Sequence, residues 1–164
     1  MPSSGGGGGA MCEPRQITGG AVGLKHAYKF QELRVGMCGG FSVVVTAEML
    51  EKFRVLSGDD SHLHANTDYM LSKGFKGVLL HGAALGMFYS RLVGKHLPGE
   101  YAMSLSYDLR FKKPVYVGDC LQVSGRIVHL NEAFQVASLK ARIENINDEP
   151  FLVSTADILA KVLE

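Results

Sequence analysis

The stretch that decides the fold is GVLLHGAALGMFYSRLVGKHLPGEYAMSLSYDLRF, residues 77–111. Its first part, residues 77–93, is apolar on nearly every side of a helix, which is typical of a helix buried in a core. It falls short of the roughly 20 apolar residues of a membrane span and contains His81 and Arg91. Apolar and polar residues then alternate strictly over 101–111, as in a half-buried strand. The segment predicts a buried helix followed by a long strand.

The rest of the C-terminal half adds further strands. A second alternation at residues 121–127 follows turn residues around Pro114 and Gly118. Two more strands are predicted at 134–146 and 151–162, and both slip phase midway, which indicates a bulge or a strong bend. The economical arrangement is an α+β fold in which an antiparallel sheet wraps around a central buried helix.

The N-terminal half contains residues that mark the start and the end of a helix. Residues 41–45 are β-branched and apolar, and Thr46 can cap a helix whose apolar positions recur at helical spacing. Gly58 ends that helix. The glycine-containing, polar stretch 59–77 predicts a loop-rich excursion with one helical turn near 67–71, and functional residues concentrate in such loops.

The length of 164 residues fits a single domain. Residues 1–23 are Gly- and Ser-rich and lack periodic apolar positions, so we expect a disordered tail followed by one domain over 24–164. With 17 Lys and Arg against 16 Asp and Glu, the net charge is +1, which provides no strong field for polyanions or membranes. No basic patch interleaved with aromatic residues is visible. Nucleic acid is therefore not an expected partner, and no membrane span is expected.

The N-terminal region also bears on the compartment. It has no basic region followed by an apolar run, so no secretory signal is expected. A mitochondrial presequence would be rich in Arg and poor in acid, whereas this region offers Arg15 and contains Glu13. The three cysteines lack the close pairs of zinc or redox motifs. We expect an intracellular soluble protein.

Acid and base candidates concentrate in FRVLSGDDSHLH, residues 53–64. On a continuous helix Asp59 and His64, five residues apart, would point about 140° away from each other. A break after Gly58 followed by a tight turn would instead bring carboxylate and imidazole toward one point, where they could hold a water. The alternative is that Asp59 is a turn residue and His64 a hydrogen-bonded, half-buried histidine. Spacing alone favours the alternative.

Zinc is a rival interpretation of the same stretch. His62, His64, Asp59 or Asp60 and a distant His81 are competent ligands. The flanking Asp-Asp-Ser indicates a turn rather than a strand that would align the two rings, and no Cys or Glu stands nearby to complete a familiar site. We therefore expect neither a metal nor a cofactor.

A second group of candidates lies in the predicted buried helix. His81 and Gly82 fall in its first turns, where unpaired backbone amides and the positive end of the dipole can hold an oxyanion. The alternative for Gly82, together with Gly86, is close packing of helix against sheet. Ser90 lies two turns on from Gly82 and on the same face, although a lone Ser ordinarily bonds to its own helix. Motifs of serine hydrolases, phosphate-binding loops and dinucleotide folds are absent from the sequence.

Three blocks of the sequence resemble one known family. FRVLSGDDSHLH (53–64), FKGVLLHGAALGMFYSRLVGKHLPG (75–99) and LRFKKPVYVGD (109–119) occur in the order found in the MaoC-like (R)-specific enoyl-CoA hydratases and the mitochondrial 3-hydroxyacyl-thioester dehydratases. The similarity runs from about Val35 to the C-terminus. It implies a hotdog fold, a homodimer, and reversible addition of water to a trans-2-enoyl thioester of CoA or acyl carrier protein in fatty acid metabolism. By analogy, a mitochondrial matrix or cytoplasmic location follows.

The resemblance also implies roles for individual residues. Asp59 and His64 occupy the family's catalytic positions. Gly82, directly after His81, stands where a backbone amide of the family binds the thioester carbonyl, and Ser90 matches a serine that lines the same site.

The sequence departs from the family at one turn. Ser61 and His62 stand where the family usually has Asn and Pro, and without the Pro the turn is less rigid. Two rival functions therefore stay open. One is a hotdog acyl-CoA thioesterase, which would release free thiol, and the other is a non-catalytic domain that binds acyl thioesters.

Overall fold

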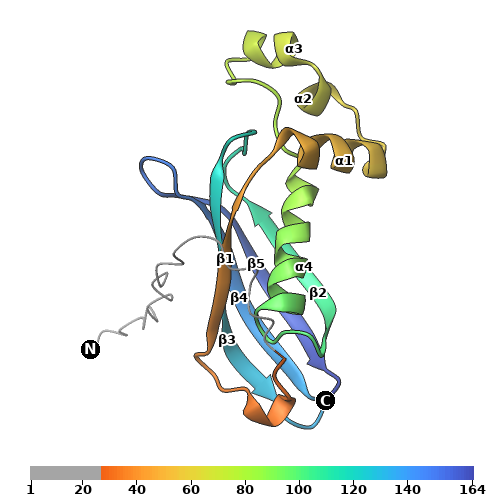
Figure 1. Cartoon of the computed structure of the whole chain (residues 1–164), viewed down its shortest axis with the longest axis vertical. Helices are drawn as coiled ribbons and strands as arrows, with labels where there is room; N and C mark the ends of the chain where they lie inside the picture. Colours follow the sequence, from red (N-terminus) through yellow and green to blue (C-terminus); the bar gives the residue numbers. More distant parts are fainter. Residues whose placement is uncertain (1–26) are drawn as a thin grey trace, which may run out of the picture.

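The computed structural model describes residues 27–164, so the predicted tail over 1–23 lies outside the described residues. Five strands form one antiparallel sheet in the order β1-β3-β4-β5-β2 (Figure 1). The strands are β1 Cys38–Val44, β2 Ala102–Phe111, β3 Cys120–Asn131, β4 Val136–Asn145 and β5 Phe151–Val162. The helices are α1 Ala47–Ser57, α2 His62–Ala65, α3 Thr67–Ser72 and α4 Leu85–Lys95, with 3₁₀ turns η1 Phe30–Glu32 and η2 Gly82–Ala84. The predicted α+β class with an antiparallel sheet is confirmed.

Helix α4 lies along the concave face of the sheet (Figure 1). Its side chains Phe88, Tyr89 and Leu92 are buried in the core, and the Tyr89 hydroxyl donates to Ser154 Oγ on β5 at 3.1 Å. Gly125 on β3 permits the close approach, because a Cβ there would lie 2.8 Å from Leu92 Cδ2. The sheet is therefore wrapped around a central helix, as the sequence predicts.

The start of this helix differs from the prediction of a helix over 77–93. Leu79 N donates to Leu63 O on α2 at 2.9 Å and Leu80 N to Val115 O in the loop after β2 at 2.8 Å, so these amides do not bond within a helix of their own. The helical segment begins at η2, which runs directly into α4. The predicted burial on all sides is also wrong, since Met87 and Ser90 are exposed.

Strand β2 contains a bulge that its alternating sequence does not reveal. The register of its pairing with β5 shifts between Ser104 and Ser106, and the side chains change face at that point. Tyr107 and Leu109 pack against the core, whereas Met103 and Leu105 remain 47% and 49% exposed. The prediction of a single buried face over 101–111 is therefore wrong in its first half. Of the two phase slips predicted in the last strands, only the one in β5 is confirmed: the register shifts where β5 has the extra residue Val153, whereas β4 alternates without a slip.

The predicted start and end of helix α1 are confirmed. Thr46 Oγ1 accepts a hydrogen bond from Met49 N at 3.2 Å, and Gly58 ends the helix in the left-handed conformation with φ of 70°. Helices α1, α2 and α3 gather beyond one end of the sheet (Figure 1). In the part of the chain that the structure describes, no helix is long and apolar enough to cross a membrane. This helical end of the molecule carries the candidate site.

Candidate active site

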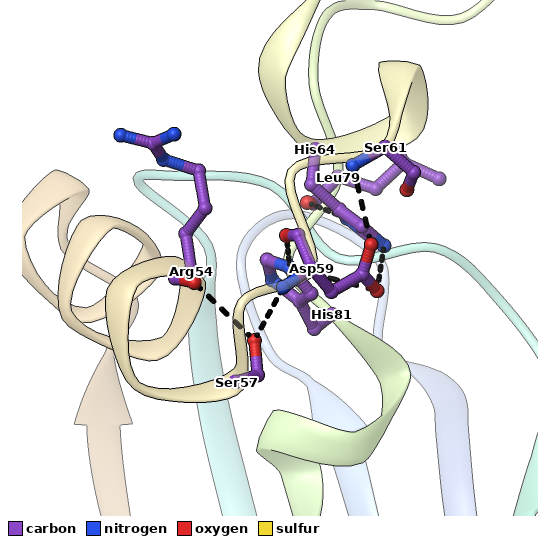
Figure 2. Close-up of polar contacts among 7 residues, drawn as sticks. All are labelled: Arg54, Ser57, Asp59, Ser61, His64, Leu79 and His81. Atoms are coloured by element: carbon purple, nitrogen blue, oxygen red, sulfur yellow. Dashed lines mark hydrogen bonds and ion pairs between the residues drawn. The ribbon is translucent and has the colours of Figure 1, made fainter.

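Asp59 lies in a tight turn between α1 and α2. Its Oδ1 accepts a hydrogen bond from Ser61 N at 3.2 Å, and its own N–H donates to Ser57 Oγ at 3.2 Å (Figure 2). The hydrogen bond from the Ser61 backbone is the main cause that lowers the pKa of the Asp59 carboxyl, assisted by the Ser61 side chain and by the nearby histidines. The half-exposed side chain is therefore a carboxylate at neutral pH.

His64, on α2, presents one ring nitrogen to the Asp59 carboxylate (Figure 2). Its Nδ1 lies 2.8 Å from Leu79 O. A carbonyl oxygen can only accept, so Nδ1 carries the hydrogen and Nε2 of the neutral ring carries a lone pair. That Nε2 lies 3.8 Å from Asp59 Oδ2. The pair therefore offers two acceptors that face one another.

The gap between these two acceptors fits one water molecule. At 3.8 Å the atoms of Asp59 and His64 are too far apart for a direct hydrogen bond. A water donating to both at about 2.8 Å would subtend an angle of about 85°, which is within reach of its two O–H bonds. The break after Gly58 brings the two side chains together, which a continuous helix would not do. Their part in a reaction remains a prediction.

His81 connects the parts of this cluster. It is 2% exposed, and its Nε2 lies 2.8 Å from the main-chain oxygen of Asp59, so Nε2–H is the donor. Its ring stacks on His64 with centroids 3.6 Å apart and an interplanar angle of 19°, and Phe53 contacts it at 4.9 Å. Within residues 27–164 its buried Nδ1 has no hydrogen-bond partner. The structure thus places His81 behind the Asp59–His64 pair (Figure 2).

The geometry does not suit the zinc site considered from the sequence. In the described part of the chain, Asp59, His64 and His81 have ligand atoms within 4.8 Å of one another. The two rings are stacked, however, so their in-plane lone pairs run side by side instead of converging on a tetrahedral centre. The hydrogen on His81 Nε2 also blocks that atom. His62, the further ligand of that hypothesis, contacts Tyr69 at 5.1 Å between ring centroids.

An apolar pocket of about 550 Å³ opens beside the cluster. His64 and Gly82 line it together with apolar side chains such as Phe75 and Phe111. A Cβ at Gly82 would lie 3.3 Å from the Phe111 ring, so the glycine lets the pocket wall close. The volume lies in the range of small-molecule sites.

Of the candidates in the predicted buried helix, Gly82 lines this pocket and Ser90 does not. Gly82 is the first residue of the helical segment, and its N–H has no helical carbonyl to bond. Ser90 is exposed on α4, roughly 12 Å further along the helix axis, and does not line the pocket. His64 and Gly82 therefore line the same cavity, whereas Ser90 lies outside it.

Comparison with known proteins identifies the family. The model of the MaoC like domain matches residues 37–148, which is most of the described chain. The chain belongs to the MaoC-like family. The resemblance found in the sequence is thereby confirmed, and its relatives are hydratases and dehydratases.

Two curated relatives illustrate the similarity of this MaoC-like chain. It is 33% identical to the (R)-specific enoyl-CoA hydratase of Aeromonas caviae over 113 residues, covering 69% of this chain and 84% of that protein. It is 31% identical to a mitochondrial 3-hydroxyacyl-[acyl-carrier-protein] dehydratase of Arabidopsis thaliana over 87 residues, covering 53% and 51% of the two chains.

Two solved structures of (R)-hydratases have the same fold as this chain. An (R)-hydratase from Pseudomonas aeruginosa, in its unliganded form, superposes with a TM-score of 0.76 at 25% identity, covering 83% of this chain and 86% of the other. The (R)-hydratase of A. caviae involved in PHA biosynthesis superposes with a TM-score of 0.74 at 30% identity, covering 80% and 98%. The predicted hotdog fold of the MaoC-like chain is confirmed.

Proposed function

We propose that this chain is an (R)-specific hydratase/dehydratase that interconverts trans-2-enoyl and 3-hydroxyacyl thioesters carried by CoA or acyl carrier protein. The observation that carries the proposal is the water-sized gap between Asp59 Oδ2 and His64 Nε2. His64 also lines the apolar pocket that contains Gly82. Water, an apolar acyl chain and an amide donor can therefore meet in one place.

Hydration needs three things that these groups can provide. A water must reach the β-carbon, a proton must reach the α-carbon, and negative charge on the thioester oxygen must be stabilised in between. The lone pair of His64 Nε2 and the Asp59 carboxylate would bind the water, remove its proton and return one to the α-carbon. They form a coupled pair, so the pair performs the proton transfer.

The amide of Gly82 would bind the thioester oxygen. As the first amide of the helical segment it has no helical acceptor, and the segment's dipole reinforces its positive end. One such donor is commonly worth about 3 kcal/mol of transition-state stabilisation.

Substitutions in the pair test the proposal. Asp59→Asn and His64→Ala should each lower the rate of crotonyl-CoA hydration by at least about a hundredfold, because each removes a proton-transfer group. Asp60→Asn is the matched control, since this adjacent carboxylate lies outside the Asp59, His64 and His81 cluster, and it should keep the wild-type rate. Full activity in Asp59→Asn or His64→Ala would refute the role of the pair.

The rival functions differ in their products. A thioesterase acting on the same thioester would release free thiol, whereas hydration removes the enoyl absorbance without releasing any. A binding domain would change neither quantity. Following both in one reaction separates the three functions.

We also propose that two copies of the chain associate along β2. This strand is an edge of the sheet, and Met103 and Leu105 on it are exposed apolar side chains, as is Met87 on α4. A two-fold pairing would cover the free edge and apolar side chains beside it. It would also cover the α4 face that bears Ser90, so the predicted place of Ser90 in the site depends on the second copy. Leu105→Glu should convert a dimer to a monomer in light scattering, and a wild-type monomer would refute the pairing.

The compartment remains part of the proposal. The plant relative is described as mitochondrial, and a location in the mitochondrial matrix or the cytoplasm fits an enzyme of acyl thioesters. Microscopy of the full chain with a C-terminal fluorescent tag would decide between them.

A further inference from the structure

Three lysines lie in the lining of the candidate pocket or of the hollow that adjoins it. Lys112 and Lys113, directly after β2, line the same cavity as His64 and Gly82. Lys76 and Lys113 line an adjoining hollow of about 700 Å³, so Lys113 stands where the two meet. All three side chains are exposed. We call Lys76, Lys112 and Lys113 the lysine rim.

The lysine rim differs from the cations on the outer face of the sheet. There, Lys140 pairs with Asp157 at 2.8 Å, Arg110 also pairs with Asp157, at 3.0 Å, and Arg142 pairs with Glu144, at 3.0 Å. Among residues 27–164, no carboxylate lies within ion-pair distance of a rim lysine. Asp119, Asp148 and Glu149 line the adjoining hollow with Lys76 and Lys113, whereas no described carboxylate lines the pocket that Lys112 and Lys113 share with His64, so the uncompensated positive charge lies on the pocket side.

The lining of the cavity therefore combines two kinds of group. It is mostly apolar and includes His64 and Gly82, and it also includes the exposed Lys112 and Lys113. A ligand that fits must be apolar with a polarisable carbonyl at one end and anionic at the other. A thioester on a phosphorylated pantetheine arm has this arrangement, and lysine is a common phosphate binder.

We propose that the lysine rim binds the phosphate of the pantetheine arm. The placement of the ligand's thioester rests on the function proposed above, whereas the rim rests on lysines with no carboxylate within ion-pair distance. Lys113 Nζ lies 4.8 Å from the centre of the Phe151 ring, a contact that leaves its charge available to an anion. Asp119, Asp148 and Glu149 line the adjoining hollow, and these carboxylates disfavour phosphate there. The phosphate therefore lies on the pocket side, and Lys112 and Lys113 contribute more than Lys76.

Binding of saturated thioesters tests the rim without any turnover. The probes are butyryl-CoA, butyryl-phosphopantetheine and butyryl-pantetheine, which carry several phosphates, one phosphate and none. In the double variant Lys112→Glu, Lys113→Glu, we expect the Kd of the two phosphorylated probes to rise about tenfold. The Kd of butyryl-pantetheine should change less than twofold. Lys95→Glu is the matched control, because Lys95 is an exposed lysine at the opposite end of α4.

The Kd values, measured by isothermal titration calorimetry, decide the assignment. If the double variant binds all three probes more weakly by the same factor, or binds all three as the wild type does, the rim does not bind the phosphate. Weakening of butyryl-CoA alone would also overturn the assignment, because the lysines would then recognise the nucleotide instead of the arm. A second measurement uses the wild-type chain alone. Added salt should raise the Kd of butyryl-CoA and leave that of butyryl-pantetheine unchanged.

The proposed function can fail separately. A wild-type chain that binds butyryl-CoA through the rim and hydrates the crotonyl thioester of neither CoA nor acyl carrier protein would refute hydratase activity and leave the phosphate site in place.

Discussion

Replacing His81 with Phe removes one hydrogen bond and leaves a planar ring stacked on His64. The lost bond is the 2.8 Å contact from Nε2–H to the Asp59 main-chain oxygen, and an unsatisfied carbonyl costs about 1–3 kcal/mol. The substitution also removes the buried Nδ1, which has no partner in the described chain and whose burial carries a similar cost. The two effects offset, so the unfolding free energy should change by less than about 1 kcal/mol.

The rate should respond far more than the stability. The hydrogen bond holds the Asp59 turn against the ring of His81, and displacement of a catalytic group by 1 Å can cost about a hundredfold. We therefore expect His81→Phe to lower kcat for crotonyl-CoA between about 10- and 100-fold, with Tm within a few degrees of wild type.

His81→Gln is the matched variant. Its side-chain amide can still donate to the Asp59 carbonyl but cannot stack on His64, and stacking is worth about 0.5–1.5 kcal/mol. It should lose more stability and less kcat than His81→Phe. The order of the two variants in kcat should therefore be opposite to their order in Tm. A kcat within twofold of wild type for His81→Phe, or rate losses that simply follow Tm, would refute the positioning role.

Three further predictions concern the turn and the core. His62 is the first residue of α2, and Ser61 before it is extended with ψ of 155°, as a residue before proline should be. His62→Pro should therefore raise unfolding free energy by about 0.4–1 kcal/mol in urea titrations, and a loss would contradict this. The lowered pKa of Asp59 means that its stabilising contribution is present above the ordinary aspartate pKa and is lost as pH falls through the lower folded value. Asp59→Asn should accordingly flatten the fall of Tm below about pH 4, and an unchanged curve would refute it. Tyr89→Phe removes the buried bond to Ser154 and should cost about 1 kcal/mol in the same titrations.

Local signals predicted much of the fold. Thr46 and Gly58 mark the ends of α1 because capping is decided by neighbouring backbone groups. The last strand was predicted over 151–162, as the structure has it. The predicted start of the buried helix is wrong because the amides of Leu79 and Leu80 bond to α2 and to the loop after β2, which no local pattern encodes.

The candidate site was predictable in a different way. Spacing alone favoured a turn residue at Asp59 and a structural histidine at His64, and the family resemblance singled them out as a catalytic pair. The contact of His81 with the Asp59 main chain spans 22 residues of sequence and leaves no periodic signal. The bulge near Ser104 is likewise set by pairing with β5, so the outward turn of Leu105 could not be anticipated.

The central claim is tested most directly by incubating the chain with crotonyl-CoA in ¹⁸O-labelled water. Mass spectrometry and chiral analysis of the product then identify the bond that water has formed. Our account predicts (3R)-3-hydroxybutyryl-CoA with one ¹⁸O at the β-carbon, no free CoA thiol, and loss of this product in Asp59→Asn. Label in a free carboxylate with release of CoA, or unchanged crotonyl-CoA, would contradict it.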